Sequence, residues 1–283
     1  MRLFPSSPAK ELDFSKRTCI MGVLNVTPDS FSDAGMFYSG QKAVSHALRM
    51  AGEGAGIIDI GGESTRPGSE PLPADEELKR VIPVIEAIRK QSPVPISIDT
   101  YKADIARRAV EAGASIINDI SGMRFDPLMP QVAASLGVPV VLMHIKGTPR
   151  DMQKEPVYEA LIPEILDYLR ESIRIAEDAG VHADRIIIDP GIGFGKTFDH
   201  NLEILKNLGL FTGLGKPVLV GASRKAFIGR ILGGAPPLER LEGTLAAHTA
   251  AILNGASIIR AHDVKEAVRA ARVADAIKRG RIE

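Results

Sequence analysis

Short apolar runs along this chain end repeatedly in polar residues, and helix-like stretches separate nearly all of them. The runs and the polar residues that close them are CIMGVLN (Asn25), IIDIGGEST (Glu63, Ser64, Thr65), PISIDT (Asp99, Thr100), SIINDIS (Asn118, Asp119), VVLMH (His144), RIIIDPG (Asp189), VLVGASRK (Ser223, Arg224, Lys225) and SIIRAHD (Arg260, His262, Asp263). Uninterrupted apolar runs are typical of parallel strands that are buried on both faces. Eight such units predict a (β/α)8 TIM barrel, in which the carboxyl ends of all strands meet at one face and form the active site.

The segments between these runs have the periodicity of amphipathic helices. In one of them Ala43, Ala47, Met50 and Ala51 share a face, which is the spacing of a helix that packs against a sheet. The expected helices are residues 41–55, 75–90, 102–112, 127–136, 158–179, 201–208, 238–254 and 264–278, and the first barrel strand is expected at 18–24. The regular alternation of the two patterns indicates parallel β-α units.

A single domain is expected, because no linker or charge block divides the chain. Residues 1–16 are interpreted as an N-terminal lead-in, a hairpin across the bottom of the barrel, and residues 17–283 as the barrel itself. Three connections that follow strands are long, at residues 26–40, 62–74 and 146–156. Connections of more than about 12 residues are commonly lids or binding loops, and all three fall on the predicted active-site face.

The charge balance excludes some classes of partner. Lys plus Arg and Asp plus Glu both count 35, so the formal net charge is zero. A nucleic-acid groove or a polybasic membrane surface would need a cationic excess, so neither is expected. The one cysteine, Cys19, lies in an apolar run and is interpreted as a buried thiol. The N-terminus lacks the apolar core of a signal peptide and no run is long enough to span a membrane, so a cytoplasmic location is expected.

Two nucleotide-binding motifs are excluded by single residues of this chain. The string DPGIGFGKT at residues 189–197 is not a phosphate loop, because Pro190 stands where that motif requires glycine. It is not a dinucleotide fingerprint either, because the third glycine would fall on Lys196. A tight zinc site is not expected without an HExxH motif, paired cysteines or a histidine cluster, and His144 is expected to pack or hydrogen-bond at a strand end.

Asp99, Asn118 and Asp189 close three different strands and form the strongest candidate site. Each of them alone is equally well explained as a helix cap. Together, two carboxylates and an amide at a barrel mouth suit a flat ligand with several N–H donors. Each charge-assisted hydrogen bond to such a ligand is worth about 1.5–3 kcal/mol.

Cationic residues follow the last two predicted strands. Ser223–Lys225 is open to three interpretations: a phosphate anchor near the seventh strand, an exposed cation at a helix start, or a Schiff-base lysine at Lys225. Arg260 and His262 alternate along the last strand, and with Arg66 they are interpreted as a cationic rim. The alternative is a set of salt bridges to nearby acids.

The chain closely resembles the dihydropteroate synthases of bacterial folate synthesis. The stretches that carry the resemblance are MGVLNVTPDSFSD, DIGGESTRPG, ISIDTYK, IINDIS, MHIKGTP, DPGIGFGK, GASRKAFIG and IIRAHDV, which together span residues 21–264. The resemblance implies a barrel enzyme that condenses 6-hydroxymethyl-7,8-dihydropterin diphosphate with 4-aminobenzoate, with the help of Mg²⁺. The products would be 7,8-dihydropteroate and pyrophosphate. It also implies a homodimer packed through its last helices.

The resemblance assigns roles to individual positions. The pterin would be bound by Asp99, Asn118, Met143, Asp189, Phe194 and Lys225; the diphosphate by Asn25, Thr65, Arg66, Arg260 and His262; and 4-aminobenzoate by Thr65, Pro67, Phe194 and Ser223. Asn25 would also be the protein ligand of magnesium, an ion that needs only one or two protein oxygens when phosphates supply the rest. Asp99, Lys225, Arg260 and His262 would be the catalytic residues.

The favoured mechanism is dissociative, with C–O cleavage before attack by the arylamine and with Asp99 stabilising the cationic pterin. Three rival functions are considered. A pterin-binding methyltransferase domain acting on a methylated folate would share the inner pocket but would need no cationic rim. An aldolase would use Lys225 as a Schiff base, and an inactive paralog would bind pterin without turnover.

Overall fold

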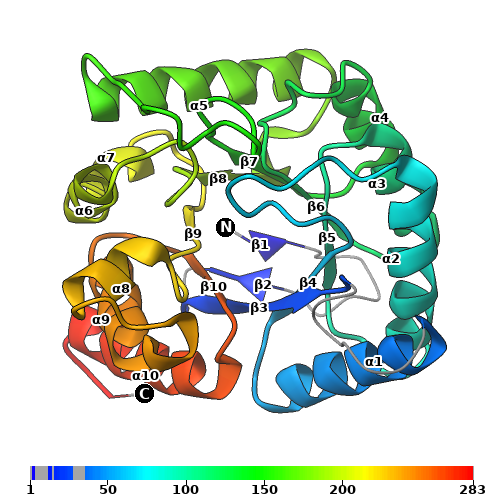
Figure 1. Cartoon of the computed structure of the whole chain (residues 1–283), viewed down its shortest axis with the longest axis horizontal. Coiled ribbons are helices and arrows are strands. Elements are labelled where there is room, and N and C mark those ends of the chain that lie inside the picture. Colours follow the sequence, from blue (N-terminus) through cyan, green and yellow to red (C-terminus); the bar gives the residue numbers. More distant parts are fainter. Residues whose placement is uncertain (1, 4–11, 15, 28–35, 283) are drawn as a thin grey trace.

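Eight parallel strands form the centre of the molecule (Figure 1). The computed structural model describes residues 2–3, 12–14, 16–27 and 36–282. Within these residues the strands lie in the order β8-β7-β6-β5-β4-β3-β10-β9, and a parallel bridge between Ile188 and Val218 joins the two edges. Their bounds are β3 Cys19–Asn25, β4 Ile57–Gly61, β5 Ile96–Asp99, β6 Ile116–Asp119, β7 Val140–Met143, β8 Ile186–Asp189, β9 Leu219–Val220 and β10 Ile258–Ala261. The predicted (β/α)8 barrel is confirmed.

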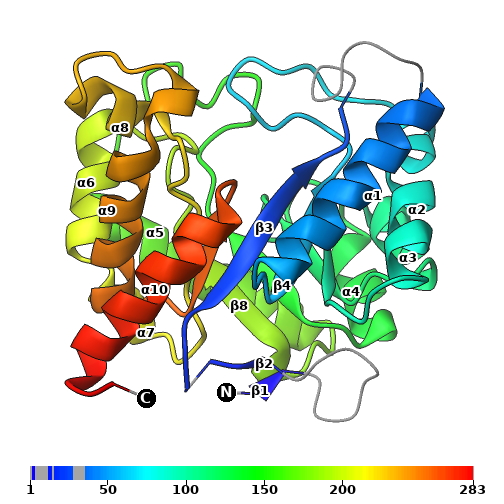
Figure 2. The same ribbon diagram turned by 90° about the horizontal axis from the view of Figure 1, so that it is seen from below.

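Helices surround this sheet (Figures 1 and 2). Their bounds are α1 Met36–Gly52, α2 Ala74–Arg89, α3 Ala103–Glu111, α4 Met129–Leu136, α5 Leu161–Asp178, α6 Phe198–Lys206, α7 Gly209–Thr212, α8 Ala226–Ile231, α9 Leu241–Leu253 and α10 Val264–Arg279. All eight expected helices are present. No described helix has the length and apolar character that a membrane crossing requires.

Two short helices were not predicted from the sequence, and some helix ends differ from their predicted positions. The helices α7 and α8 lie on either side of β9, and each is too short to give a periodic signal. Helix α6 begins three residues earlier than expected, at Phe198, because Thr197 and His200 form a capping box at its N-terminus. Side-chain capping therefore explains this difference.

The N-terminal lead-in pairs with itself, as expected. Strand β1 (Arg2–Leu3) pairs antiparallel with β2 (Leu12–Asp13), and both lie at the end of the barrel away from the long loops (Figure 2). Phe14 packs against the inner core, and Asp275 of α10 accepts hydrogen bonds of 2.8 Å from the backbone N–H and the hydroxyl of Thr18. These contacts attach the lead-in to the bottom of the barrel.

Strand periodicity places the site residues. Successive residues along a strand point to opposite faces of the sheet, so every second residue points into the barrel. The lower interior is filled by an apolar cluster of Cys19, Met21, Ile57, Ile116, Val141, Ile187, Leu219 and Ile258. Burial raises the pKa of the Cys19 thiol to about 12, as expected for a buried thiol. Five residues each follow one of these apolar residues by two positions along a strand: Asp59, Asn118, Met143, Asp189 and Arg260. Because every second residue points the same way, these side chains also point into the barrel.

Candidate active site

Strand register brings several predicted site residues to one level of the barrel mouth. Asn25 pairs with Gly61, Gly61 with Asp99, and Asp99 with Asn118, across four neighbouring strands. Further around the barrel Met143 pairs with Asp189. Residues that are 164 positions apart in the sequence (189 − 25) therefore lie on one rim.

Arg260 is paired with two buried carboxylates. Its Nε lies 2.6 Å from Asp59 Oδ2, and its terminal Nη2 lies 2.8 Å from Asp99 Oδ2. Asn118 donates its amide to both oxygens of Asp59, at 3.3 and 3.2 Å. The sequence analysis missed Asp59, which is fully buried. The signal that would have revealed it is an acidic residue inside an apolar run (IIDI), where an unpaired charge is too costly to be accidental.

Asp99 has one engaged and one free carboxylate oxygen. Its Oδ2 accepts the hydrogen bond from Arg260, whereas no donor among the described residues reaches its buried Oδ1. Burial raises the pKa of Asp99 to about 7; Arg260 opposes this shift and the nearby Asp59 adds to it. A buried oxygen without a donor is costly in a folded protein unless a ligand supplies one.

The loop after β8 holds Asp189 and Phe194 in place. Asp189 Oδ1 accepts the N–H of Gly191 at 2.7 Å, and burial raises the pKa of this carboxyl to about 6. Gly191 has φ +72°, and a Cβ there would lie 1.9 Å from the carbonyl oxygen of His144. This loop therefore packs directly on the end of β7, and only glycine fits at the contact.

A buried lysine–histidine pair supports the same loop. Lys196 is 2% exposed, lies 2.9 Å from His144 Nδ1, and donates to the carbonyl of Phe194 at 2.9 Å. Burial, and secondarily Lys196, lowers the pKa of His144 to about 2, so the imidazole is neutral and accepts the hydrogen bond. The prediction that His144 hydrogen-bonds at a strand end is confirmed; the role of Lys196 was missed.

Lys225 lies beside the acidic residues. Its ammonium is 4.3 Å from the centre of the Phe194 ring. Burial lowers the pKa of Lys225 to about 8; Arg260 contributes in the same direction, while Asp189 and Asp99 oppose the shift. The Arg260–Asp99 contact, and the packing of Lys225 against Gly193 and Phe194 in the loop that follows Asp189, bring these groups to the same end of the barrel.

A salt bridge joins the two cationic segments. Arg224 pairs with Asp263 through Nε at 3.0 Å and through a second, shorter contact from Nη2. Arg224 has a left-handed φ of +57°, and its N–H donates to the Thr244 hydroxyl at 3.0 Å. The Arg224–Asp263 salt bridge therefore holds the segment that contains Ser223 and Lys225 against the segment that follows Arg260.

His262 corrects one sequence-based interpretation. Its Nδ1 lies 2.9 Å from the Ser223 hydroxyl, so these two predicted residues do meet. Burial, followed by Arg260 and Arg224, lowers the pKa of His262 to about 3. The imidazole is therefore neutral at physiological pH, and the rim expected to carry Arg66, Arg260 and His262 as cations does not include a charged histidine. The main reason is burial, and the nearby charges of Arg260 and Arg224 add to it.

The second loop, residues 62–73, carries the remaining predicted contacts. Thr65 is half-buried, whereas Arg66 and Pro67 are exposed. The N–H of Gly68 donates to the carbonyl of Pro149 at 2.9 Å, so this loop touches the third long loop, which runs from β7 to α5. The first long connection, expected at residues 26–40, lies largely outside the described residues, and α1 begins within it at Met36.

An apolar cluster borders the polar groups. Met143 is buried with Ile120, Ile145 and Met152, and Tyr101, Phe125 and Phe194 pack against them. The predicted pterin contacts Met143 and Phe194 are therefore in one cluster. Carboxylates next to apolar and aromatic side chains are the combination that binds a flat heterocycle.

Asn25 suits a shared magnesium ion. A Cβ built on Gly61 would lie 3.9 Å from Asn25 Oδ1 and 3.7 Å from Asp99 Oδ2, so the lack of a side chain there leaves space beside these two oxygens. The described residues contain no group of three or more His, Cys, Asp or Glu side chains suited to a metal. This donor set fits an ion held chiefly by substrate oxygens.

The fold and the site define a class: a barrel enzyme that binds a flat, N–H-rich heterocycle with an anionic substituent. The sequence matches the family described as "Pterin binding enzyme" over residues 21–262. The chain is 54% identical to the dihydropteroate synthase of Bacillus subtilis, covering 94% of this chain and 90% of that protein.

Solved structures agree. The Xanthomonas albilineans dihydropteroate synthase with 4-aminobenzoic acid matches with a TM-score of 0.91 at 45% identity over 98% of both chains, and its complex with 7,8-dihydropteroate with 0.88 at 42% over 98% of this chain and 99% of that one. The Yersinia pestis enzyme in complex with a sulfonamide drug matches with a TM-score of 0.92 at 42% identity over 99% and 100% of the two chains. The chain belongs to the dihydropteroate synthase family.

Proposed function

We propose that the mouth of the barrel is the active site for the reaction of this family. The chain condenses 6-hydroxymethyl-7,8-dihydropterin diphosphate with 4-aminobenzoate to give 7,8-dihydropteroate and pyrophosphate in folate biosynthesis. The observation that carries the site assignment is the buried Oδ1 of Asp99, which has no donor among the described residues and lies in register with Asn118 on the next strand. A pterin ring supplies the N–H donors that this arrangement lacks.

The pterin ring would lie among the acids and the apolar cluster. Asp189 would accept the 2-amino group and the adjacent ring N–H as a bidentate pair. Asn118 would both donate to and accept from the ring, and Lys225 would donate to the carbonyl side. Met143 and Phe194 would pack against the ring.

The diphosphate would lie toward Arg260. Arg260, Arg66 and Thr65 would contact its oxygens, together with His262 as a neutral donor. Asn25 would hold a magnesium ion that the substrate brings, and such an ion neutralises the charge that develops on the leaving group. Thr65, Pro67, Phe194 and Ser223 would border 4-aminobenzoate.

The mechanism follows from this distribution of charge. C–O cleavage comes first, with Arg260 stabilising the departing diphosphate. The electron-rich dihydropterin takes up the positive charge of its methylene, and Asp99 stabilises that cation through the ring N–H. The arylamine then attacks and loses its proton, so no strong general base is needed. Asp99, Lys225, Arg260 and His262 are the residues in contact with the reacting pterin diphosphate.

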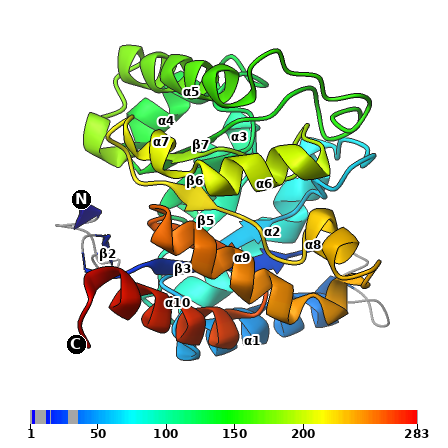
Figure 3. The ribbon, with the colours of Figure 1, turned by 90° about the vertical axis from the view of Figure 1, so that its left-hand side faces the viewer.

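We also propose a cytoplasmic homodimer that packs through its last helices. Leu253 of α9 and Val273 and Ile277 of α10 are 42%, 61% and 62% exposed. An apolar groove of about 450 Å³ is lined by residues of α6, α8 and α9. These three helices lie on the same side of the molecule (Figure 3). Apolar side chains gathered on one side of a protein favour a protein partner, and a second copy is the partner that the family resemblance implies.

Pyrophosphate release tests the proposed reaction. Purified protein is mixed with pterin diphosphate and Mg²⁺, with and without 4-aminobenzoate. Dihydropteroate should form only when all three components are present, together with an equal amount of pyrophosphate. A methyltransferase or an inactive paralog would release none, and trapping of a borohydride-reduced adduct on Lys225 would instead support the aldolase.

A further inference from the structure

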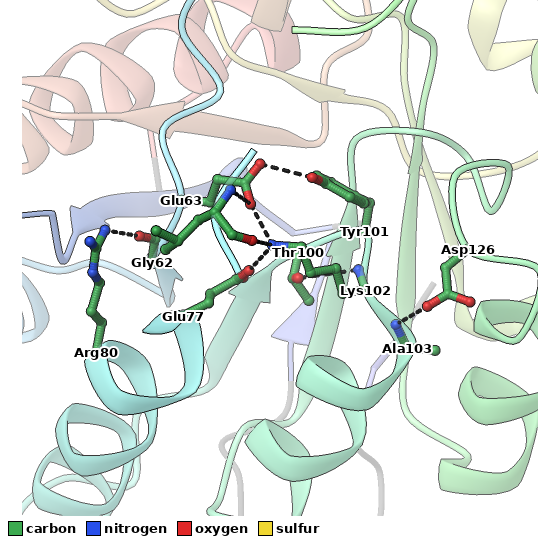
Figure 4. Close-up of polar contacts among 10 residues, drawn as sticks. Gly62, Glu63, Glu77, Arg80, Thr100, Tyr101, Lys102, Ala103 and Asp126 are labelled. Atoms are coloured by element: carbon green, nitrogen blue, oxygen red, sulfur yellow. Dashed lines mark hydrogen bonds and ion pairs between the residues drawn. The ribbon is translucent and has the colours of Figure 1, made fainter. Parts of the chain in front are cut away.

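A buried ionic network lies at the base of the second loop (Figure 4). The ammonium of Lys102 lies 2.5 Å from Glu63 Oε2, 2.6 Å from the carbonyl of Leu72 and 2.7 Å from Glu77 Oε2. The side chains of Lys102, Glu63 and Glu77 are only 18%, 7% and 1% exposed. The three acceptors use all three N–H groups of the ammonium.

Glu63 completes the closure of this loop. Its Oε2 also accepts the N–H of Leu72 at 3.1 Å, and its Oε1 accepts the hydroxyl of Tyr101 at 2.9 Å. Glu63 and Leu72 are the first and last residues of the segment that carries Thr65 and Pro67. Both ends of the segment are therefore attached to one lysine.

The root of the loop is also packed against α2. A Cβ at Gly62 would lie 2.8 Å from a methyl carbon of Val81 and 2.9 Å from Cγ of Glu77. Arg80 donates to the Gly62 carbonyl at 2.9 Å (Figure 4). Helix α2 and the loop root therefore form one rigid support.

The same lysine is close in sequence to the pterin site. Asp99 ends β5, and the chain reaches Lys102 three residues later. The N–H of Thr100 donates to the Asn118 carbonyl at 3.0 Å, which fixes this short segment to β6. Lys102 thus connects the strand ends that hold the pterin groups to the loop that carries the predicted 4-aminobenzoate contacts.

We propose that Lys102 is a positioning residue that sets the distance between the 4-aminobenzoate contacts of the second loop and the pterin bound at Asp99. The inference rests on the proposed function. Two buried carboxylates around one lysine contribute little to stability compared with apolar residues of the same size. What they provide is a fixed geometry, which a reaction between two bound molecules requires.

Three variants test the proposal, with steady-state kinetics and thermal unfolding as measurements. Lys102→Met removes the centre of the network but leaves Glu77 buried without a counter-charge, so its folding is at risk. Glu63→Ala removes only the carboxylate that the second loop contributes to the network and leaves the Lys102–Glu77 pair intact. Glu63→Gln keeps one acceptor oxygen for the N–H of Leu72 and for Lys102, and its amide NH2 can donate to the Tyr101 hydroxyl. Lys79→Met is the matched control, because Lys79 pairs with Glu76 on the exposed face of α2.

We expect Glu63→Ala to raise KM for 4-aminobenzoate by about tenfold, equivalent to about 1.4 kcal/mol. The dissociation constant of pterin diphosphate should stay within about twofold, since its binding groups are untouched. Glu63→Gln should recover most of the loss, and Lys79→Met should match the parent chain. In Glu63→Ala, hydrogen exchange at Leu72 should accelerate.

Two results would overturn the proposal. One is a folded Glu63→Ala protein with an unchanged KM for 4-aminobenzoate. The other is a parallel loss of both substrates' binding together with a lowered Tm, which is the signature of general destabilisation. A parent chain that releases no pyrophosphate would instead refute the proposed function, so the two failures are distinguishable.

Discussion

At the scale of single residues, burial controls the chemistry of this site. The alternation of side chains along each strand directs Ile57 and Ile187 into the barrel. It also directs Asp59 and Asp189 inward, nearer the barrel mouth, where they are buried. Desolvation raises the pKa of a carboxyl and lowers that of a lysine, so groups that titrate far apart in water come to titrate close together. Perturbed groups that share one site are typical of catalysis.

Replacing Asp99 by Asn should separate turnover from binding. The amide keeps the shape of the side chain but loses the negative charge that stabilises the cationic pterin, so kcat should fall by about a hundredfold or more. The dissociation constant of pterin diphosphate should change by no more than a few-fold. Asp104→Asn, on the exposed surface of α3, is the matched control. Equal losses in kcat and in pterin binding would contradict the assigned role.

The pH profile should be bell-shaped. Asp99 has a pKa raised to about 7, so it becomes protonated and loses its charge below that pH. Lys225 has a pKa lowered to about 8, so it becomes neutral above that pH. Plots of kcat/KM against pH should therefore rise toward about 7 and fall above about 8.

The two limbs of this profile belong to different residues. Asp99→Asn should move the acid limb from about pH 7 to about pH 6, where Asp189 titrates. Lys225→Met should abolish the alkaline limb in what activity remains. A profile that stays flat from pH 6 to 9 in the parent chain would contradict both assignments.

At the scale of elements, the loops after the strands fit together through positions where only glycine is tolerated. Gly191 combines a left-handed φ with contact to the His144 carbonyl, whereas Gly215 has a φ of +69° and no neighbouring atom within 4 Å. The two positions therefore separate the cost of backbone strain from the cost of crowding.

Gly191→Ala should destabilise the protein far more than Gly215→Ala. The backbone cost alone is about 1–2 kcal/mol, which is the expected effect at Gly215. Crowding at Gly191 should add about 1–3 kcal/mol and also weaken pterin binding, because its N–H orders Asp189. Denaturant unfolding of both variants measures the difference. Equal free energies of unfolding would show that the contact with His144 is unimportant.

Elements also define what periodicity misses. Long helices such as α1 and α10 could be predicted because their apolar stripes repeat over several turns. The short helices α7 and α8 do not repeat enough to be recognised, although α8 follows directly after Lys225. The partly buried salt bridge of Arg224 and Asp263 likewise has no local signature, since its members are 39 residues apart.

At the scale of the whole molecule, the exposed apolar side chains of the last helices predict a dimer. Val273→Glu combined with Ile277→Glu would place charges in the proposed interface and should convert the dimer to a monomer, as measured by light scattering during gel filtration. Ile282→Glu is the control, because Ile282 is 94% exposed beyond the end of α10. A parent chain that is monomeric at micromolar concentration would contradict the proposal.

The sequence by itself determined the barrel, because eight apolar runs separated by amphipathic segments leave few other ways to bury so much surface. It also determined which strand ends carry polar groups, and hence that Asn25, Asp99, Asp189 and Arg260 face one rim. Both conclusions depend on local periodicity, which is written in neighbouring residues.

Only the tertiary structure decided how these groups act on one another. It paired Arg260 with Asp59, made His262 neutral by burying it near two arginines, and attached both ends of the second loop to Lys102. Such contacts join residues far apart in the chain, and burial sets their strength, because charges interact strongly only where water is excluded. Neither distance nor burial is encoded in the local pattern of residues.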